Sequence, residues 1–247
     1  DKRTGQLQRY GHLSTGNYNA RSARLYTDLS HLTCDAAITE DMDAVFRHLS
    51  SHNRLPTLQQ LVMAPFHLHS HMLERIGQAA SAAAKGKDAR IVLKMNALTD
   101  EVLIAALIDA GALGVQIDLI VRGACMLPAQ VPGRTENIRV RSVIGRFLEH
   151  TRVFYFAWGT HEEVYLSSAD WMHRNMLRRV ELAWPVHHRK LRQRIIDECL
   201  ADYLHDDRNA GQLQSDGRYQ PPMRPSAGYG EQNMLMKNYG GAASARQ

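Results

Sequence analysis

The sequence has few cysteines and no long hydrophobic segment. Its three cysteines, Cys34, Cys125 and Cys199, are widely spaced and form no Cys-x-x-Cys motif. This pattern excludes a disulfide-rich scaffold and a zinc knuckle, and it is typical of a reducing compartment. No apolar run reaches the ~18 to 20 residues that a membrane-spanning helix needs, and the polar start has no signal-peptide core. We therefore expect a soluble protein without a membrane span.

A strong charge excess is also lacking. The formal net charge of +5 and the pI near 9.2 permit an anionic partner, but they fit many ordinary domains as well. With 44% hydrophobic residues in 247, the chain can bury one sizeable core or two smaller ones. It begins with Asp rather than Met, which raises the possibility that it is a piece of a longer protein.

Helical and strand patterns alternate along most of the chain. The segment from 89 to 123 predicts strand, helix and strand, with Thr99 capping the helix, and such a βαβ unit has parallel strands. We therefore predict an α/β fold in which helices cover a mixed sheet. The expected helices are 39–50, 64–86, 99–111 and 187–204, and the expected strands are 89–96, 114–123, 138–143, 151–156, 163–168 and 178–186.

The composition changes after residue 205. Gly, Pro, Gln, Ser and Asn become frequent and aliphatic residues become rare. Such a segment is typically disordered, so we expect a disordered tail over 206–247, apart from a short hairpin around "LQSDGRY".

Three histidines lie close together in "HLHSH". On a helix, His67 and His71 can share a face, but His69 points elsewhere, so the three cannot all bind one metal ion. We interpret the cluster as a solvated helix end and expect no metal site.

Two loops of similar composition follow predicted strands. "LSTGNYN" (13–19) and "LSSADWM" (166–172) each place small residues before Asn or Asp and an aromatic. Unrelated turns would give the same pattern. A duplicated domain with one site shared between its halves would also give it, and this is the more specific hypothesis.

The blocks 9–41, 94–107, 117–156 and 162–186 resemble the carboxy-terminal half of bacterial polyphosphate kinase. That family moves the terminal phosphoryl group of ATP reversibly onto polyphosphate. The resemblance implies two phospholipase-D-like α/β domains, so residues 1–53 would end the first domain and 54–205 would form the second. It also implies a phosphohistidine in a His-x-Lys strand about 19 residues upstream of His12, which is outside this chain. We therefore expect the chain alone to be inactive.

Three residues match functional positions of the family. Tyr26 in "ARLYTD" corresponds to a nucleotide-contacting tyrosine, and Arg122 in "LIVRG" and His150 in "LEHTR" correspond to a phosphate-contacting pair. Arginine suits bidentate phosphate binding, and histidine can give a proton to a leaving oxygen, which makes His150 the catalytic candidate. From the residues alone, a surface arginine, a structural histidine and a packed tyrosine remain alternatives.

Other polar residues are candidates for supporting roles. Glu181 is predicted to orient Arg122 or His150, although an exposed strand glutamate is an alternative. The second loop is predicted to close over the site, with Trp171 packed beneath it. The supporting candidates of the two loops are Asn17, Asp170, Arg174 and Asn175.

The resemblance also implies ligands and surroundings. It predicts ATP or ADP and polyphosphate as substrates, Mg²⁺ in the full-length enzyme, a homo-oligomer, no nucleic acid, and a cytoplasmic protein that can associate with the inner membrane surface. Two other functions remain open. A phospholipase-D-type phosphodiesterase would need His-x-Lys followed by Asp, but the chain has His150, Thr151 and Arg152, with Ala157 at the aspartate position. A non-catalytic polyanion-binding module would need only the basic strand ends.

Overall fold

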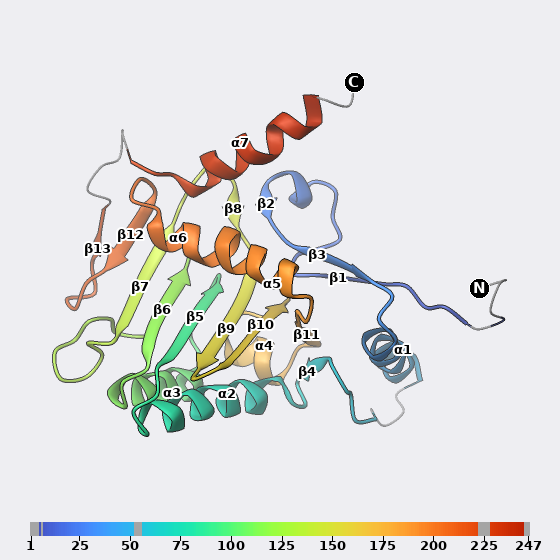
Figure 1. Cartoon of the computed structure of the whole chain (residues 1–247), viewed down its shortest axis with the longest axis horizontal. Coiled ribbons are helices and arrows are strands. Elements are labelled where there is room, and N and C mark those ends of the chain that lie inside the picture. Colours follow the sequence, from blue (N-terminus) through green and yellow to red (C-terminus); the bar gives the residue numbers. More distant parts are fainter. Residues whose placement is uncertain (1–4, 6, 52–55, 222–227, 245–247) are drawn as a thin grey trace.

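The fold is built on one mixed sheet of nine strands. The computed structural model describes residues 5, 7–51, 56–221 and 228–244. The strand order is β13-β12-β7-β6-β5-β9-β10-β11-β4 (Figure 1). These strands are β4 (Val62–Ala64), β5 (Ala89–Met95), β6 (Gln116–Val121), β7 (Ile138–Val143), β9 (Arg152–Trp158), β10 (His161–Ser167), β11 (Glu181–Pro185), β12 (Ala210–Leu213) and β13 (Tyr219–Gln220).

The predicted βαβ unit forms the centre of the sheet. β5 and β6 are parallel, with Ile91 opposite Ile117, and α3 (Glu101–Ala112) connects them. β7 continues the parallel order, whereas β9 runs antiparallel on the other side of β5. The carboxyl ends of β5 and β6 therefore lie at the same sheet edge as the start of β9. The predicted mixed α/β fold is confirmed.

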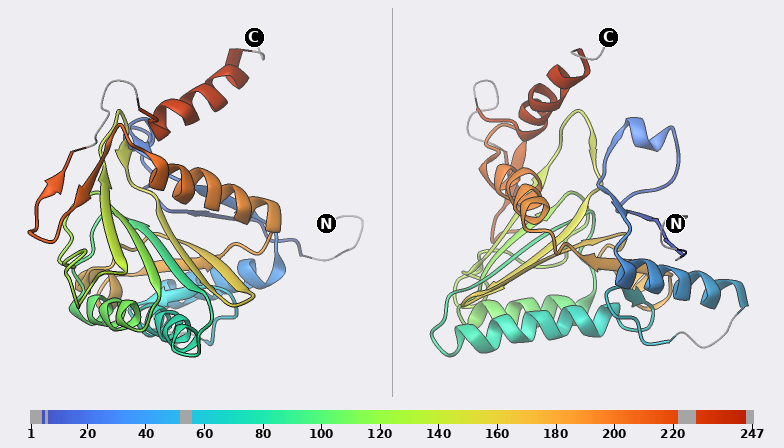
Figure 2. Two further views of the ribbon diagram at one scale, coloured as in Figure 1. Left: turned by 60° about the vertical axis from the view of Figure 1, so that its left-hand side comes forward. Right: turned by 45° about the vertical axis from the view of Figure 1, so that its right-hand side comes forward.

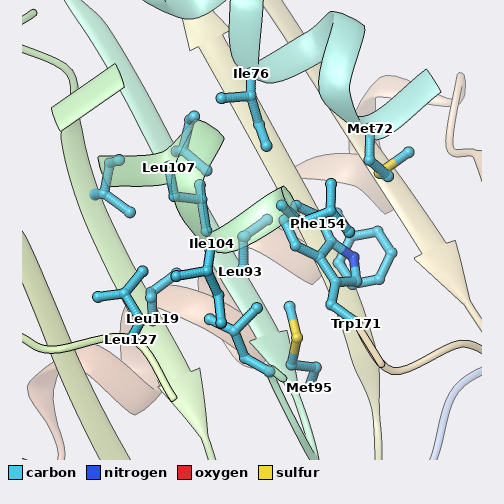
Figure 3. Packing of buried hydrophobic residues seen from close by; sticks show 14 of the residues in the cluster. Met72, Ile76, Leu93, Met95, Ile104, Leu107, Leu119, Leu127, Phe154 and Trp171 are labelled. Atoms are coloured by element: carbon cyan, nitrogen blue, oxygen red, sulfur yellow. The ribbon is translucent and has the colours of Figure 1, made fainter. Parts of the chain in front are cut away.

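Helices cover both faces of the sheet (Figure 2). α2 (Leu68–Ala83) and α3 pack on one face, where Leu93, Phe154 and the fully buried Trp171 belong to a large apolar cluster (Figure 3). The other face is covered by α5 (Arg189–Ile196), a π-helical turn over Asp197–Ala201 and α6 (Asp202–His205). Each strand of the centre is thus buried on both sides, as its apolar composition requires.

The amino-terminal residues form a separate small unit beside the strand ends. β1 (Gly11–Ser14) pairs with β3 (Ser30–Thr33), and a 3₁₀ turn over Ser22–Arg24 precedes β2 (Tyr26–Thr27). β2 pairs in parallel with β8 (Leu148–Glu149), and the two lie side by side above the main sheet in Figure 1. α1 (Ala36–Ser51) follows β3. β2 thereby brings residues 26–28 next to His150.

Several helix starts differ from the sequence-based expectation. The helix expected over 39–50 begins earlier, at Ala36. The helix expected over 64–86 begins at Leu68, because Val62–Ala64 pairs with β11 as an edge strand. The cap of α3 is Asp100 rather than Thr99, since the Asp100 carboxylate accepts the backbone N–H of Leu103 at 3.0 Å. No helix among the described residues is both long and apolar enough to cross a membrane.

The expectation of a disordered tail is wrong for the described residues after 205. The hairpin is confirmed, because β12 and β13 pair antiparallel. β12 also pairs with β7, and α7 (Glu231–Ser244) follows, with Glu231 buried. The low aliphatic content misled the prediction, since backbone pairing and buried polar contacts hold this segment to the sheet.

Candidate functional site

The candidate site lies where the amino-terminal unit meets the edge of the main sheet. His150 stands between β8 and β9, and its backbone N–H donates to Thr27 Oγ1 at 3.2 Å. Thr151 Oγ1 donates to the carbonyl of Thr27 at 3.0 Å. β2 is thus fixed against the strand that carries His150, and the two parts of the chain meet at this histidine.

The side chain of His150 is held by groups from two elements. Its Nδ1 lies 3.0 Å from Asp28 Oδ1, and its ring centroid lies 4.9 Å from that of Tyr26 at a tilt of 45°. Nη1 of Arg152 lies 3.1 Å from Nε2 of the histidine. The His150 side chain is 12% exposed. A carboxylate on Nδ1 fixes the orientation of the imidazole, as in general acid–base sites.

Asp28 is itself held in place. Thr15 Oγ1 donates to its Oδ1 at 2.9 Å, and the backbone of Thr15 donates to the carbonyl of Leu29. The loop before Asp28 also passes very close to it, because a Cβ built on Gly16 would lie 2.0 Å from Asp28 Oδ2. Only glycine permits this approach. The carboxylate is therefore positioned before any ligand binds.

Arg152 and Asp170 form a buried ion pair beneath His150. Arg152 Nη2 lies 2.8 Å from Asp170 Oδ2, and the two side chains are 9% and 11% exposed. Arg152 Nη1 also donates to the carbonyl of Thr15 at 2.9 Å. Thr15 and Asp170 belong to the two similar loops noted in the sequence. The two loops therefore converge on one guanidinium.

Arg122, by contrast, keeps most of its hydrogen-bonding capacity. It follows β6, and its Nε donates to Asn96 Oδ1 at 3.2 Å. Its two terminal nitrogens donate to none of the described residues, and Asn96 Nδ2 likewise has no described partner. Arg122 lines a narrow gap together with Glu149 and Thr151, the neighbours of His150. The free fork of the guanidinium suits a phosphate group.

A second buried ion pair lies next to His150. Lys94 Nζ is 2.9 Å from Glu149 Oε2, the two side chains are 3% and 4% exposed, and the ammonium faces the ring of Tyr203. Burial acts to raise the pKa of Glu149, but the charge of Lys94 and the hydrogen bonds from Lys94 and Gln232 outweigh it and lower the pKa. Glu149 is therefore a carboxylate.

The second loop (166–172) differs from the prediction in the partners of Glu181. Glu181 accepts hydrogen bonds from Ser168 Oγ at 2.5 Å and from Asn175 Nδ2 at 2.7 Å. The prediction that it orients Arg122 or His150 is wrong, because both of its oxygens serve its own loop. Asp170 and Asn175 are buried. Trp171 is packed beneath the loop, as predicted.

Two candidates lie on the outside of the structure. Arg174 is exposed, and its guanidinium contacts only Met172 Sδ at 3.9 Å among the described residues. Asn17 is also exposed, and its side chain makes no hydrogen bond with described residues. Neither is brought to His150 by a direct contact. Their supporting roles remain predictions.

The three clustered histidines do not form a metal site. His69 Nε2 lies 3.0 Å from the buried Asp100, and His71 Nε2 lies 3.0 Å from Tyr165 Oη. The described residues contain no group of three or more His, Cys, Asp or Glu that could hold a metal ion. The interpretation as a solvated helix end is wrong for His69 and His71, because both are tied to neighbouring elements.

Comparison with known proteins identifies the family. The family model "Polyphosphate kinase C-terminal domain 2" matches residues 61–231, and "Polyphosphate kinase C-terminal domain 1" matches residues 1–55. The chain belongs to the polyphosphate kinase family. A polyphosphate kinase of Burkholderia cenocepacia is 53% identical over 213 residues, which cover 86% of this chain and 31% of that protein. The chain thus spans about a third of the length of this curated relative.

A solved polyphosphate kinase has the same fold. The enzyme of Porphyromonas gingivalis matches 96% of this chain and 37% of its own chain, with 34% identity and a TM-score of 0.88. A more distant neighbour is Nuc of Salmonella typhimurium, a phospholipase D family member, with 15% identity over 66% of this chain and a TM-score of 0.41. The predicted family is therefore confirmed, and the mixed α/β fold agrees with it.

Some residues around His150 were not singled out from the sequence. Asp28 lies 122 positions before His150, so no spacing rule links the two. Arg152 stands two residues after His150, at the start of β9. This nearness in the sequence was the available signal for Arg152. Asn96, Lys94 and Glu149 carried no comparable signal.

Proposed function

We propose that the chain forms the nucleotide- and phosphate-binding part of a phosphotransferase that moves the terminal phosphoryl group of ATP reversibly to polyphosphate. Tyr26 would contact the nucleotide, Arg122 would bind phosphate oxygens, and His150 would act at the leaving oxygen. The nucleophile would be a histidine upstream of residue 1. Membership of the family supports this proposal and the residue roles that the resemblance implies, and the contacts of Arg122 and His150 are compatible with those roles.

The unpaired guanidinium fork of Arg122, which lines a gap together with the two sequence neighbours of His150, carries the proposal. An arginine at a strand end with two free terminal nitrogens can bind two phosphate oxygens at once. Nδ1 of His150 is hydrogen-bonded to Asp28. The other ring nitrogen, Nε2, lies near Arg152 and is the atom proposed to contact the substrate. The site therefore combines a cationic clamp and a titratable donor, two of the groups that phosphoryl transfer requires.

In the proposed reaction, the upstream histidine attacks the terminal phosphorus of ATP, the bond to the bridging oxygen breaks, and ADP leaves. His150 donates a hydrogen bond or proton to that departing oxygen, while Asp28 holds the imidazole in its orientation through Nδ1. The terminal phosphate of polyphosphate then takes the phosphoryl group from the histidine. Arg122 neutralises charge that builds up on the phosphate oxygens during both transfers.

Within the described ranges, no group of three or more His, Cys, Asp or Glu is placed to hold a metal ion. The two carboxylates nearest His150 already have partners, since Asp28 accepts from Thr15 and Asp170 pairs with Arg152. In the proposal, Mg²⁺ enters bound to the phosphates of ATP. We also propose, from the family alone, a cytoplasmic homo-oligomer.

The experiment compares the chain alone with the same chain extended upstream through the histidine-bearing domain. We expect ATP-dependent polyphosphate synthesis and radioactive labelling only in the extended protein, because the chain alone lacks the nucleophile. Steady phosphotransfer by the chain alone would contradict the proposal. Polyphosphate binding by the extended protein without any turnover would favour a non-catalytic polyanion-binding module.

A further inference from the structure

The carboxy-terminal helix reaches the segment that leads to His150. Gln232, in the first turn of α7, is 4% exposed. Its side-chain amide pairs with the backbone of Phe147 in both directions: the N–H of Phe147 donates to Oε1 at 2.9 Å, and Nε2 donates to the carbonyl of Phe147 at 2.9 Å. The Gln232 amide thus forms the same pair of hydrogen bonds with the backbone of Phe147 that a residue of a neighbouring β-strand would form.

The packing between this glutamine and the loop is tight. A Cβ built on Gly145 would lie 2.5 Å from Gln232 Oε1, so glycine is required for the loop to approach α7. The neighbouring Glu231 is also buried, and its backbone N–H donates to Asp206 Oδ2 at 3.0 Å. The first turn of α7 is therefore anchored on two sides.

Gln232 Nε2 also donates to Glu149 Oε1, which connects α7 to the buried ion pair. The other oxygen of Glu149 receives Lys94 at 2.9 Å and Thr27 Oγ1 at 3.0 Å. Thr27 Oγ1 in turn accepts the backbone N–H of His150 at 3.2 Å. A continuous hydrogen-bonded path therefore runs from Gln232 through Glu149 and Thr27 to His150.

Thr27 also affects the other partners of the histidine. It lies between Tyr26, which packs on the His150 ring, and Asp28, which binds Nδ1. A displacement of Thr27 would move both groups relative to the imidazole. General acid catalysis depends on such geometry, because a proton is transferred only within hydrogen-bond reach of the reacting oxygen.

We infer that Gln232 is a positioning residue for His150 and that it acts through Glu149 and Thr27. This inference rests on the proposed function. It assigns α7 a part in the phosphotransferase site, although α7 lies outside the main sheet and Gln232 has no direct contact with His150.

The test uses a full-length polyphosphate kinase that carries this sequence as its carboxy-terminal part. Gln232→Met keeps much of the side-chain volume and removes the three hydrogen bonds. We expect kcat to fall about tenfold with the KM for ATP changed less than twofold, because orientation rather than binding is lost. Gln214→Met is the matched control in the same tail: among the described residues, the side-chain amide of Gln214 donates only to the carbonyl of Gln212, so the change should leave kcat unchanged.

A double-mutant cycle with Thr27→Val separates positioning from general stabilisation. If Gln232 acts through Thr27, the two losses are not additive, and the double variant loses about tenfold rather than about a hundredfold. Thr27→Ser retains the hydroxyl group and should restore turnover. Additive losses, or wild-type kcat in Gln232→Met, would overturn the inference.

Gly145→Ala keeps the test decisive if Gln232→Met does not fold. The added methyl group displaces the glutamine without removing it, and kcat should again fall with little change in KM. Wild-type kcat in a folded Gly145→Ala enzyme would overturn the inference. Failure of the proposed function is a distinct result, because the unmodified full-length protein would then show no phosphotransfer.

Discussion

Two arginines on either side of β5 occupy opposite environments. Arg152 is buried, and its guanidinium is bound by Asp170 and by the carbonyl of Thr15. The side chain of Arg122 donates only to Asn96 among the described residues, so its two terminal nitrogens keep their hydrogen-bonding capacity. Because the sheet order is β6-β5-β9, the two arginines lie at the same edge. Arg152 stabilises the fold through its ion pair, and Arg122 is available to bind a ligand.

The difference separates residues that build the site from residues that act in it. A buried charge that loses its partner destabilises the folded state, so changes around Arg152 should appear mainly in stability. Arg122 has unpaired terminal donors, and His150 is proposed to act at the leaving oxygen, so changes at these two residues should appear mainly in turnover.

The largest effect on turnover is expected for His150→Gln. Glutamine keeps some hydrogen bonding but cannot titrate, so kcat should fall ~10²- to 10⁴-fold while nucleotide affinity remains nearly intact. Steady-state kinetics and nucleotide binding of the full-length enzyme would test this. His173→Gln, at the exposed start of α4 (His173–Leu177), is the control and should retain activity. A stable and fully active His150→Gln enzyme would show that His150 has a structural role and no catalytic one.

The largest effect on stability is expected for Asp170→Ala. The change leaves the Arg152 guanidinium buried without its carboxylate, which should cost about 3–5 kcal/mol of unfolding free energy. Chemical unfolding followed by the fluorescence of the buried Trp171 and Trp184 would measure it. The control is Arg139→Met, which removes a half-exposed partner of Asp118 and should cost about 1 kcal/mol or less.

The double variant Arg152→Met with Asp170→Leu sharpens this test. Removing both charges leaves no unpaired ion, so the double variant should be more stable than Asp170→Ala alone. If the two were equally unstable, the loss would come from packing rather than from an uncompensated charge.

A smaller effect is expected for Arg122→Lys. The charge is retained, but an ammonium cannot bind two oxygens in the planar fork that the free guanidinium offers. We expect turnover to fall roughly tenfold, which is about 1.4 kcal/mol, with an unchanged melting temperature. Arg139→Lys is the matched control on the same sheet, and it should keep full activity. Unchanged turnover and nucleotide affinity in Arg122→Lys would show that Arg122 binds no phosphate.

The fold was largely predictable because local patterns specify most of it. The β5-α3-β6 unit followed from apolar periodicity and one crossover rule, and the structure has it in the expected parallel form. β4 was missed, since three strand residues before a helix have no pattern of their own. The pairing of β12 with β7 and the helix α7 were missed because they depend on a distant strand and on buried polar groups, and composition reports neither.

The site was predictable in part. Tyr26 and His150 were assigned from the resemblance alone, and the structure brings them into ring contact. The partner of His150 was not predictable, because Asp28 comes from the amino-terminal unit and meets it only through the β2-β8 pairing. The assignment of Glu181 failed for a related reason. Strand alternation indicates the side on which a carboxylate lies, but it does not indicate which neighbouring donor binds it.

The smallest effect is expected for His71, which contrasts with His150 as a histidine of the scaffold. Its Nε2 contacts Tyr165 Oη at 3.0 Å, and burial, with the nearby charge of Arg75, lowers its pKa to about 4. The ordinary pKa of about 6.5 applies to the unfolded chain, which therefore binds the proton more readily between these values. Stability should fall as the pH is lowered from about 6.5 toward 4.

His71→Leu should remove this contribution, so the melting temperature of the variant should depend less on pH over that range than that of the unmodified protein. The difference should be a few degrees, because part of the ring meets solvent. Tyr165→Phe is the control: it removes the hydrogen bond but leaves His71 in place, so stability should be lower while the acid dependence persists. At neutral pH, kcat should be unchanged in His71→Leu. An altered kcat there, with an unaltered pH dependence of melting, would mean that His71 belongs with the residues that act in the site.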